Sequence, residues 1–271
     1  MRLSVVIIAH NEEANIGRLL ASVQPLVGDG KGEIIVVDSG STDRTVEIAK
    51  SFGAKVFVEE WKGYAAQKNS ALDKATGDWI LSLDADEEVS AGMREFLLLM
   101  LSGSNAGKFA DFQGGILFGR RNYFLGRWIR HGGFYPDVKV RLFRPGSGRF
   151  EARLVHEDIR LAPGLPEYAP QPAYNLGDPI DILHHSYPTL SDYIEHMNRY
   201  SSLGAEMVVA NGKIGFSAVN IVARPLATFV YNYFFRLGFL DGREGLLLHL
   251  YHAVYVSWKY AKAWELSRKP T

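Results

Sequence analysis

Two aspartates separated by a single residue, Asp84 and Asp86, stand out as candidates for chemistry in this chain of 271 residues. In an extended segment, side chains two positions apart face the same way, so both carboxylates can reach one ligand. Carboxylate oxygens suit Mg²⁺ and Mn²⁺, and Mg²⁺ is usually held by one or two carboxylates together with substrate phosphates. The spacing therefore predicts a metal and diphosphate site. An acidic turn that caps the next helix would show the same pattern.

Polar clusters also follow two earlier apolar runs. His10-Asn11-Glu12 follows the run 3–9, and Asp38 to Asp43 follows the run 33–37. Near-continuous apolar runs alternating with helical periodicity are typical of a doubly wound parallel sheet, in which ligands collect at the carboxyl ends of the strands. We therefore expect these two clusters to lie at the same edge of the sheet as Asp84 and Asp86.

The remaining pattern sets the expected fold class. Strands are expected at 3–9, 33–37, 55–58, 79–83, 115–118 and 138–143, and helices from about 16, 44–53, 66–75 and from 191 onward, with a proline-rich loop at 164–179. This order predicts an α/β, Rossmann-type, mostly parallel sheet flanked by helices. We expect one α/β domain over 1–190 and a C-terminal helical, aromatic-rich extension over 191–271.

Composition excludes several classes of protein. Lys+Arg and Asp+Glu both number 30, whereas a nucleic-acid binder would usually show a basic excess. The absence of Cys excludes disulfides and fits a reducing compartment. The first apolar run is too short for a secretory signal. We expect a cytoplasmic location, with possible peripheral contact at the cytoplasmic face of the inner membrane.

The charge balance is uneven between residues 118 and 153. Only Asp137 and Glu151 oppose the basic residues there, which are Arg120, Arg121, Arg127, Arg130, Lys139, Arg141, Arg144, Arg149 and Arg153. The run predicts either a solvated basic face or a groove for an anionic substrate. Arg141 and Arg144 could grip phosphates through bidentate hydrogen bonds.

Four motifs in the first 90 residues resemble those of family 2 glycosyltransferases in order and spacing. They are Val5 to Glu13, Val36 to Asp43, Gln67-Lys68-Asn69 and Leu83 to Glu87. Four later segments are similar to bacterial glycosyltransferases of the lipopolysaccharide inner core, namely Gly132 to Asp137, Val140 to Arg144, Val155-His156-Glu157 and Gly238 to Gly242.

The resemblance implies a GT-A fold and an inverting, metal-dependent transfer from a nucleotide sugar, expected to be a UDP-sugar. The acceptor would be a lipopolysaccharide-core or other cell-envelope glycan or glycolipid. Asp38 would hydrogen-bond the base, while Ala9, Asn11 and Glu12 would line the nucleotide pocket.

The resemblance also implies roles around the diphosphate. Lys68 and Arg141 would approach the phosphates. Asp84 would contact ribose or metal, and Asp86 would bind Mg²⁺ or Mn²⁺ directly. Similar folds supply a histidine as a further metal ligand, for which either His184 or His185 would serve; we take His185 as the candidate.

An inverting transfer needs a general base that takes the proton of the acceptor hydroxyl. Glu157 is the first candidate, because it follows a strand-like segment after the basic run. Asp137 is the second, and Asp158 is a further alternative.

The C-terminal helical pattern predicts an amphipathic helix. Leu247, Leu250, Val254, Trp258 and Ala261 share one face, and His249, His252, Lys259 and Lys262 share another. Such a helix suits either an anionic membrane surface or packing on the catalytic domain. The apolar stretches are too short or too interrupted to span a bilayer. The oligomeric state stays open.

Rival classes lack their own motifs. A dinucleotide oxidoreductase would carry G-x-G-x-x-G where this chain has Ala9-His10-Asn11-Glu12, a sugar nucleotidyltransferase would have a Gly-rich basic loop there, and a D-x-D phosphatase would place that motif after the first strand. One alternative stays open, a catalytically inactive nucleotide-sugar-binding protein on the same scaffold.

Overall fold

The computed structural model describes residues 1–102, 109–151, 158–170, 178–212 and 215–268. The described strands are β1 Leu3–Ala9, β2 Gly32–Asp38, β3 Lys55–Val58, β4 Trp79–Asp84, β5 Glu87–Val89, β6 Gly115–Phe124, β7 Arg127–Trp128, β8 Asp137–Phe143, β9 Gly148–Phe150, β10 Ile159–Leu161, β11 Glu167–Tyr168 and β12 Asp181–Tyr187. The described helices are α1 Ile16–Val27, α2 Thr45–Ser51, α3 Tyr64–Asp73, α4 Ala91–Leu101, α6 Leu190–Ala210, η1 Val219–Ala223, α7 Arg224–Val230, η2 Tyr231–Phe235, η3 Gly238–Asp241 and α8 Gly242–Arg268.

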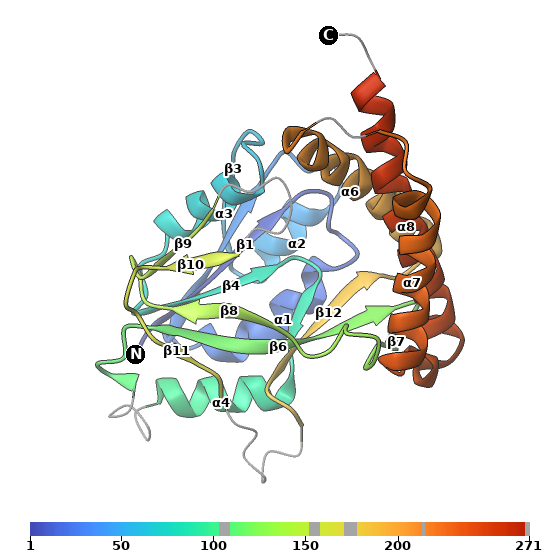
Figure 1. The fold of residues 1–271 in the computed structure, drawn as a ribbon. Helices are drawn as coiled ribbons and strands as arrows, with labels where there is room; N and C mark the ends of the chain where they lie inside the picture. The colour runs from blue at the N-terminus through green and yellow to red at the C-terminus, as the bar shows by residue number, and fades with distance from the viewer. Residues whose placement is uncertain (103–108, 152–157, 171–177, 213–214, 269–271) are drawn as a thin grey trace. The chain divides into compact units, whose positions relative to one another are not determined.

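Ten strands form one sheet in the order β3-β2-β1-β4-β8-β6-β12-β5, with β7 and β11 paired to β6 (Figure 1). Strand β1 lies between β2 and β4 and pairs in parallel with both. Strand β8 runs antiparallel to β4, and β12 runs antiparallel to β5. The predicted fold class, a mostly parallel sheet flanked by helices with C-terminal helices, is confirmed.

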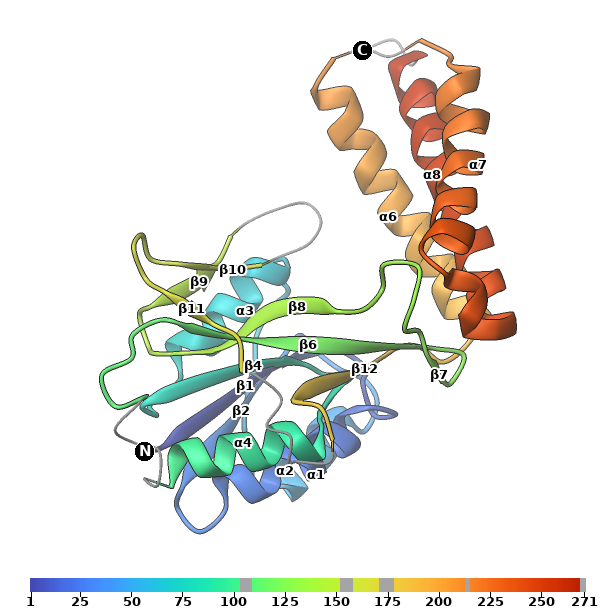
Figure 2. The same ribbon diagram turned by 60° about the horizontal axis from the view of Figure 1, so that its bottom comes forward.

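Helices cover both faces of this sheet. Helices α1, α2 and α4 lie on one face, and α3 lies on the other with the small β9–β10 sheet (Figure 2). Alternate residues of β1 explain this: Val5 packs in the cluster of α1 and α4, whereas Val6 packs in the cluster of α3. Burial on both faces is why the strands read as continuous apolar runs rather than as alternating ones.

The chain forms two compact units, whose boundaries fall within β6, β8 and β12. Unit 1 comprises Met1–Arg120 and Val138–His184, and unit 2 comprises Arg121–Asp137 and His185–Thr271. The last boundary lies close to the division expected at residue 190. The segment 121–137, however, groups with the C-terminal helices rather than with the N-terminal unit.

Within unit 2, helices α6 and α7 both pack against α8. His249 of α8 is buried, and its ring explains why two positions of the later motifs, 132 and 238, are glycine. A Cβ at Gly132 would lie 2.0 Å from His249 Cε1, and one at Gly238 would lie 2.2 Å from His249 Nε2. Only glycine allows the backbone to approach the imidazole this closely. Burial lowers the pKa of His249, so the ring is neutral at pH 7.

The faces expected for α8 were wrong. His249 is buried, and burial lowers the pKa of His252 to about 4, so neither contributes to a basic stripe at pH 7. Leu250 is exposed, whereas Leu248 and Val256 on another face are buried. The reason is tertiary: α8 packs against both α6 and α7, so the buried face follows its neighbours rather than its own apolar stripe. Every helix in the described part of the chain is too short or too polar to cross a membrane.

Candidate active site

The carboxyl ends of β1, β2 and β4 meet at one edge of unit 1, as expected. In the register of the parallel strands, Ala9 lies opposite Asp38, and Ile8 lies opposite Asp84. The loops that follow these three strands therefore begin side by side. This edge is where a doubly wound sheet binds its ligands.

Asn11 connects the first two of these loops. Its backbone N–H donates to Ser41 Oγ at 2.9 Å, and its Oδ1 accepts from the Thr42 N–H at 2.8 Å. Its φ of 55° lies in the left-handed region, which asparagine tolerates better than most residues. Next to it, the Glu12 N–H donates to Thr45 Oγ1 at 2.7 Å, and the Ala9 carbonyl accepts from the Ser39 N–H at 3.0 Å.

Asp38 is buried and shapes the second loop from within. Its Oδ1 accepts from the N–H groups of Gly40 and Ser41 at 2.9 Å each, and its Oδ2 accepts from the Ser41 hydroxyl. These bonds occupy much of the accepting capacity of the carboxylate. A contact from Asp38 to a nucleotide base would come in addition to this structural work.

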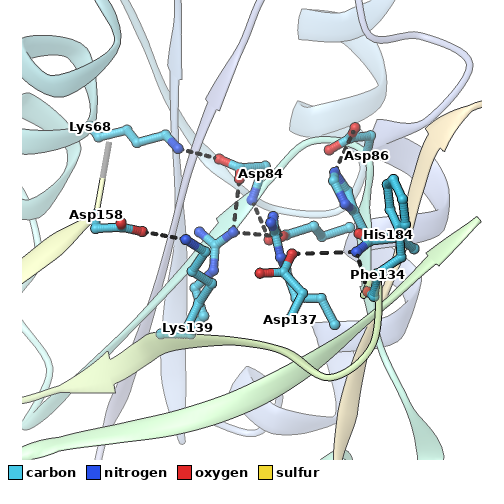
Figure 3. A network of polar contacts seen from close by, with 12 residues as sticks. Lys68, Asp84, Asp86, Phe134, Asp137, Lys139, Asp158 and His184 are labelled. Atoms are coloured by element: carbon cyan, nitrogen blue, oxygen red, sulfur yellow. Dashed lines mark hydrogen bonds and ion pairs between the residues drawn. The ribbon is translucent and has the colours of Figure 1, made fainter. Parts of the chain in front are cut away.

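Asp84 is held between two cations (Figure 3). Lys68 Nζ lies 2.6 Å from its Oδ1, and Arg141 Nη2 donates to its Oδ2 at 2.9 Å. Burial disfavours the charged carboxylate, but the positive charges of Lys68 and Arg141 outweigh that cost and hold the pKa of Asp84 well below its usual range. The structure thus brings together three of the predicted site residues from α3, β4 and β8.

Glu87 also lies at this edge, and no role was predicted for it from the sequence. Its buried carboxylate accepts from the Asp84 N–H at 2.9 Å, from Arg141 Nη2 at 2.5 Å and from Arg120 Nη1 at 3.3 Å. It fixes the turn between Asp84 and Asp86 and orients Arg141. Its position one residue after the D-x-D was the signal that could have pointed to it.

Asp86 faces a histidine of β12. The Asp86 Oδ2 and His184 Nε2 atoms are 3.3 Å apart. Burial opposes both charges, yet the pair lowers the pKa of Asp86 and raises that of His184. His185 points to the opposite face of the strand by alternation, and its ring stacks on Tyr123 at 5.1 Å between centroids. Of the two histidines considered, the geometry therefore favours His184 over His185 as a partner of Asp86.

Negative charge accumulates around Asp86. Burial raises the pKa of Glu12, a hydrogen bond from Asn15 opposes this, and the charges of Asp86, Asp43 and Asp84 raise it further. Among the described residues, no cluster of three or more His, Cys, Asp or Glu side chains is arranged to hold a metal ion. Asp86 and His184 are the described residues here that would hold a cation, and the further role expected for Asp84 in binding a metal stays a prediction.

Of the three candidates for the general base, the structure describes Asp137 and Asp158. Asp137 is the first residue of β8, and its Oδ2 lies 3.4 Å from the Asn122 amide nitrogen, which also donates to the Phe134 carbonyl at 3.1 Å. Asp158 forms an ion pair with Lys139 at 2.7 Å. Glu157 lies outside the described residues.

Several described members of the basic run pair with acidic side chains of unit 1. Arg120 and Arg141 bind Glu87, Lys139 binds Asp158, and Arg149 pairs with Asp73. The expectation for Arg144 was wrong. Its guanidinium donates to the carbonyls of Phe109 and Asp78, at the amino end of β4, because β8 runs antiparallel to β4 and carries Arg144 away from Asp84.

Comparison with known proteins agrees with this arrangement. The model of "Glycosyl transferase family 2" matches residues 4–146, which include β1, β4 and the D-x-D. The chain belongs to this family. It is 32% identical to the lipopolysaccharide core biosynthesis glycosyltransferase LpsC of Rhizobium meliloti over 89% of this chain and 82% of that one. It is 29% identical to an uncharacterized glycosyltransferase of Rickettsia typhi, over 99% and 88% respectively.

The fold is similar to that of a solved mannosyltransferase. The mannosyltransferase PcManGT of Pyrobaculum calidifontis, solved in complex with GDP-Man and Mn²⁺, matches with a TM-score of 0.56 and 18% identity, covering 97% of this chain and 86% of that one. The likeness of fold thus extends beyond the residues that the family model matches. The resemblance to glycosyltransferases drawn from the sequence motifs is confirmed.

Proposed function

We propose that this family 2 glycosyltransferase is a metal-dependent, inverting enzyme that moves a sugar from a nucleotide diphosphate donor, expected to be a UDP-sugar. The observation that carries the proposal is the edge at Asp84 and Asp86, where one carboxylate is held by Lys68 and Arg141 and the other faces His184. The GDP-Man and Mn²⁺ bound by the structural neighbour PcManGT support the donor class and the metal, while the base of the nucleotide is left to the test.

The residues present fit a divalent cation. Asp86 offers an oxygen ligand and His184 a nitrogen ligand, 3.3 Å apart, and Mn²⁺ accepts both kinds. Burial is the main cause of the raised pKa of Glu12, and the neighbouring charges of Asp86, Asp43 and Asp84, which a cation would offset, add to it. When bound, the metal would stabilise the charge that grows on the departing diphosphate.

The protein's own residues prepare this site. Lys68 and Arg141 keep Asp84 ionised and fix its orientation toward the donor. Glu87 holds Arg141 in place and ties the turn between the two aspartates through the Asp84 N–H. Asn11 and Asp38 hold the loops that would surround the base and ribose.

Transfer requires removal of one proton. A carboxylate would take the proton from the acceptor hydroxyl as its oxygen attacks C1 of the sugar, while the bond from C1 to the diphosphate oxygen breaks on the opposite face. We assign this role to Glu157 or Asp137, with Asn122 as the neighbour that positions the Asp137 carboxylate.

We propose a lipopolysaccharide-core or related cell-envelope glycan as acceptor, reached at the cytoplasmic face of the inner membrane. The support is the 32% identity to LpsC over most of both chains.

The test is release of nucleotide diphosphate by the purified full chain. A panel of UDP-, GDP- and ADP-sugars would be offered with Mn²⁺ and with truncated lipopolysaccharide acceptors, and the glycan product would be analysed by mass spectrometry. We expect one donor to give metal-dependent release and a product heavier by one sugar. Nucleotide binding by calorimetry without release for any donor would favour the inactive binding protein instead.

A further inference from the structure

The helical run η1–α7–η2 in unit 2 turns an apolar stripe to solvent. Exposed apolar side chains recur at every third or fourth position, namely Val219, Val222, Leu226, Val230 and Phe234. The exposed fraction reaches 66% for Val219, 61% for Leu226 and 75% for Phe235. A surface helix normally turns such a stripe toward the core.

The exposed apolar surface continues beyond this run. Leu237, Phe239 and Leu240 are exposed after η2, and Leu246 and Leu250 are exposed on the first turns of α8. Within residues 219–235, Pro225 is the only buried residue. Contiguous exposed apolar surface of this extent marks an interaction site rather than ordinary scatter. We call residues 219–240 the apolar ridge.

Most charges in and next to the apolar ridge are positive, and Glu244, which follows Arg243, is half-buried and lies 3.7 Å from the Arg127 guanidinium. Residues 215–243 contain Arg224, Arg236 and Arg243, which are all exposed, and one acidic residue, Asp241. Asp241 is 1% exposed and accepts from the backbone N–H groups of Arg130 and His131 at 3.2 and 2.8 Å, so it does not face solvent.

We propose that the apolar ridge binds the surface of a membrane that contains anionic lipids. Its Leu, Val and Phe side chains would enter the boundary between headgroups and acyl chains, and the arginines would meet the phosphates of the headgroups. A second copy of the chain is a poorer occupant, because a two-fold interface would bring the same arginines of both copies to one patch. The acceptor proposed above would be reached at such a membrane surface, whereas binding to lipid needs neither donor nor acceptor.

The test is flotation of the purified full chain with vesicles, without nucleotide sugar. Vesicles of phosphatidylcholine alone would be compared with vesicles that contain phosphatidylglycerol as well. We expect binding to the anionic vesicles that weakens with salt. Leu226→Ser with Phe235→Ser should lower the partition coefficient about tenfold or more, because two large apolar side chains lose their contact with the acyl region.

Two matched variants make the result specific. Leu99→Ser with Met207→Ser, an exposed apolar pair outside the apolar ridge, should bind like the parent chain. Arg224→Gln with Arg243→Gln should lose about tenfold on anionic vesicles and little on phosphatidylcholine. Circular dichroism would verify the fold of each variant.

Three outcomes would overturn the proposal. They are no flotation with anionic vesicles at low salt, equal binding by the Leu226→Ser/Phe235→Ser variant, and a dimer in light scattering that this variant abolishes while no vesicle binding occurs. Because donor turnover is absent from the assay, failure here would leave the proposed transferase activity untouched, and an inactive chain could still bind vesicles.

Discussion

The two ends of the parallel strands in unit 1 both bury a carboxylate, but they use it differently. At the amino end, Glu33 accepts from Lys55 Nζ, the Ser4 hydroxyl, the Thr76 hydroxyl and the Thr76 N–H at 2.7–2.8 Å. Burial opposes its charge, but these donors outweigh it and lower the pKa of Glu33 to about 2. One negative charge is therefore satisfied by the protein itself.

At the carboxyl end, Asp84 is satisfied in the same way, whereas Asp86 pairs with His184 and Glu12 accepts from the Asn15 amide at 2.9 Å. Burial raises the pKa of Glu12, and the charges of Asp86, Asp43 and Asp84 raise it further. The difference teaches that a buried, strongly ionised carboxylate does not by itself mark a site. A buried carboxyl group whose pKa is raised, at the ligand-binding edge of the sheet, is the more specific sign.

The largest effect at the carboxyl end of the strands is expected from Asp86→Asn. It removes a proposed metal ligand while leaving the fold intact, so we expect the metal-dependent release of nucleotide diphosphate to fall about a thousandfold. The melting temperature should change by less than about 4 °C. Full turnover at saturating Mn²⁺ would refute the metal assignment.

The second prediction separates the two candidate bases. The correct carboxylate, changed to its amide, should lower kcat by about 10²- to 10⁴-fold while donor binding is preserved. Asp137→Asn and Glu157→Gln would be compared in single-turnover transfer and in calorimetric titration with the nucleotide diphosphate. If both variants transfer at the parent rate, neither residue is the base.

The third prediction uses neighbouring histidines as each other's control. His184→Ala should weaken Mn²⁺ activation about 10- to 100-fold, because a partner of Asp86 is lost. His185→Ala, which loses a stacking contact with Tyr123, should leave the Mn²⁺ concentration for half-maximal activity unchanged. The reverse order would restore the assignment made from sequence.

The fourth prediction tests the amino end of the sheet, where the effect is on stability alone. Glu33→Gln should lower the free energy of unfolding at pH 7 by about 2 kcal/mol and leave turnover unchanged. Because the pKa of Glu33 is lowered in the folded state, its contribution is complete above about pH 4.5 and is lost as the pH falls toward 2.

Urea unfolding of parent and variant between pH 7 and pH 3 would measure this, and the two curves should converge toward the acid end. The exposed pair of Arg44 and Glu47 provides the control, since Glu47→Gln should not shift the midpoint. A gap between parent and Glu33→Gln that stays constant down to pH 3 would contradict the assignment.

Local sequence determined the strands β1, β2, β3 and β4 with the helices between them, and the edge at which the polar clusters meet, but not the short strand β5. Strands β1 and β3 have the expected bounds, β4 is longer by one residue at its carboxyl end, and β2 is longer by one residue at each end. The runs of β1, β2 and β4 are buried on both faces, which makes them unambiguous, whereas β3 is largely exposed. Asp38 makes its own local hydrogen bonds to Gly40 and Ser41, so its position followed as well. The hydrogen bonds of Asn11, in contrast, reach Ser41 and Thr42 in the loop after β2 and depend on the tertiary structure. The expected cytoplasmic location stays a prediction.

Only the tertiary structure decided which partners these residues have. Because β8 runs antiparallel to β4, Arg141 contacts Asp84, whereas Arg144, only three residues later, donates to the Phe109 carbonyl instead. Strand alternation on β12 chose His184 over His185, and packing of α8 on two helices buried His249 and left the apolar ridge exposed. Such choices depend on strand direction and helix contacts between distant segments, and no local pattern of residue types encodes them.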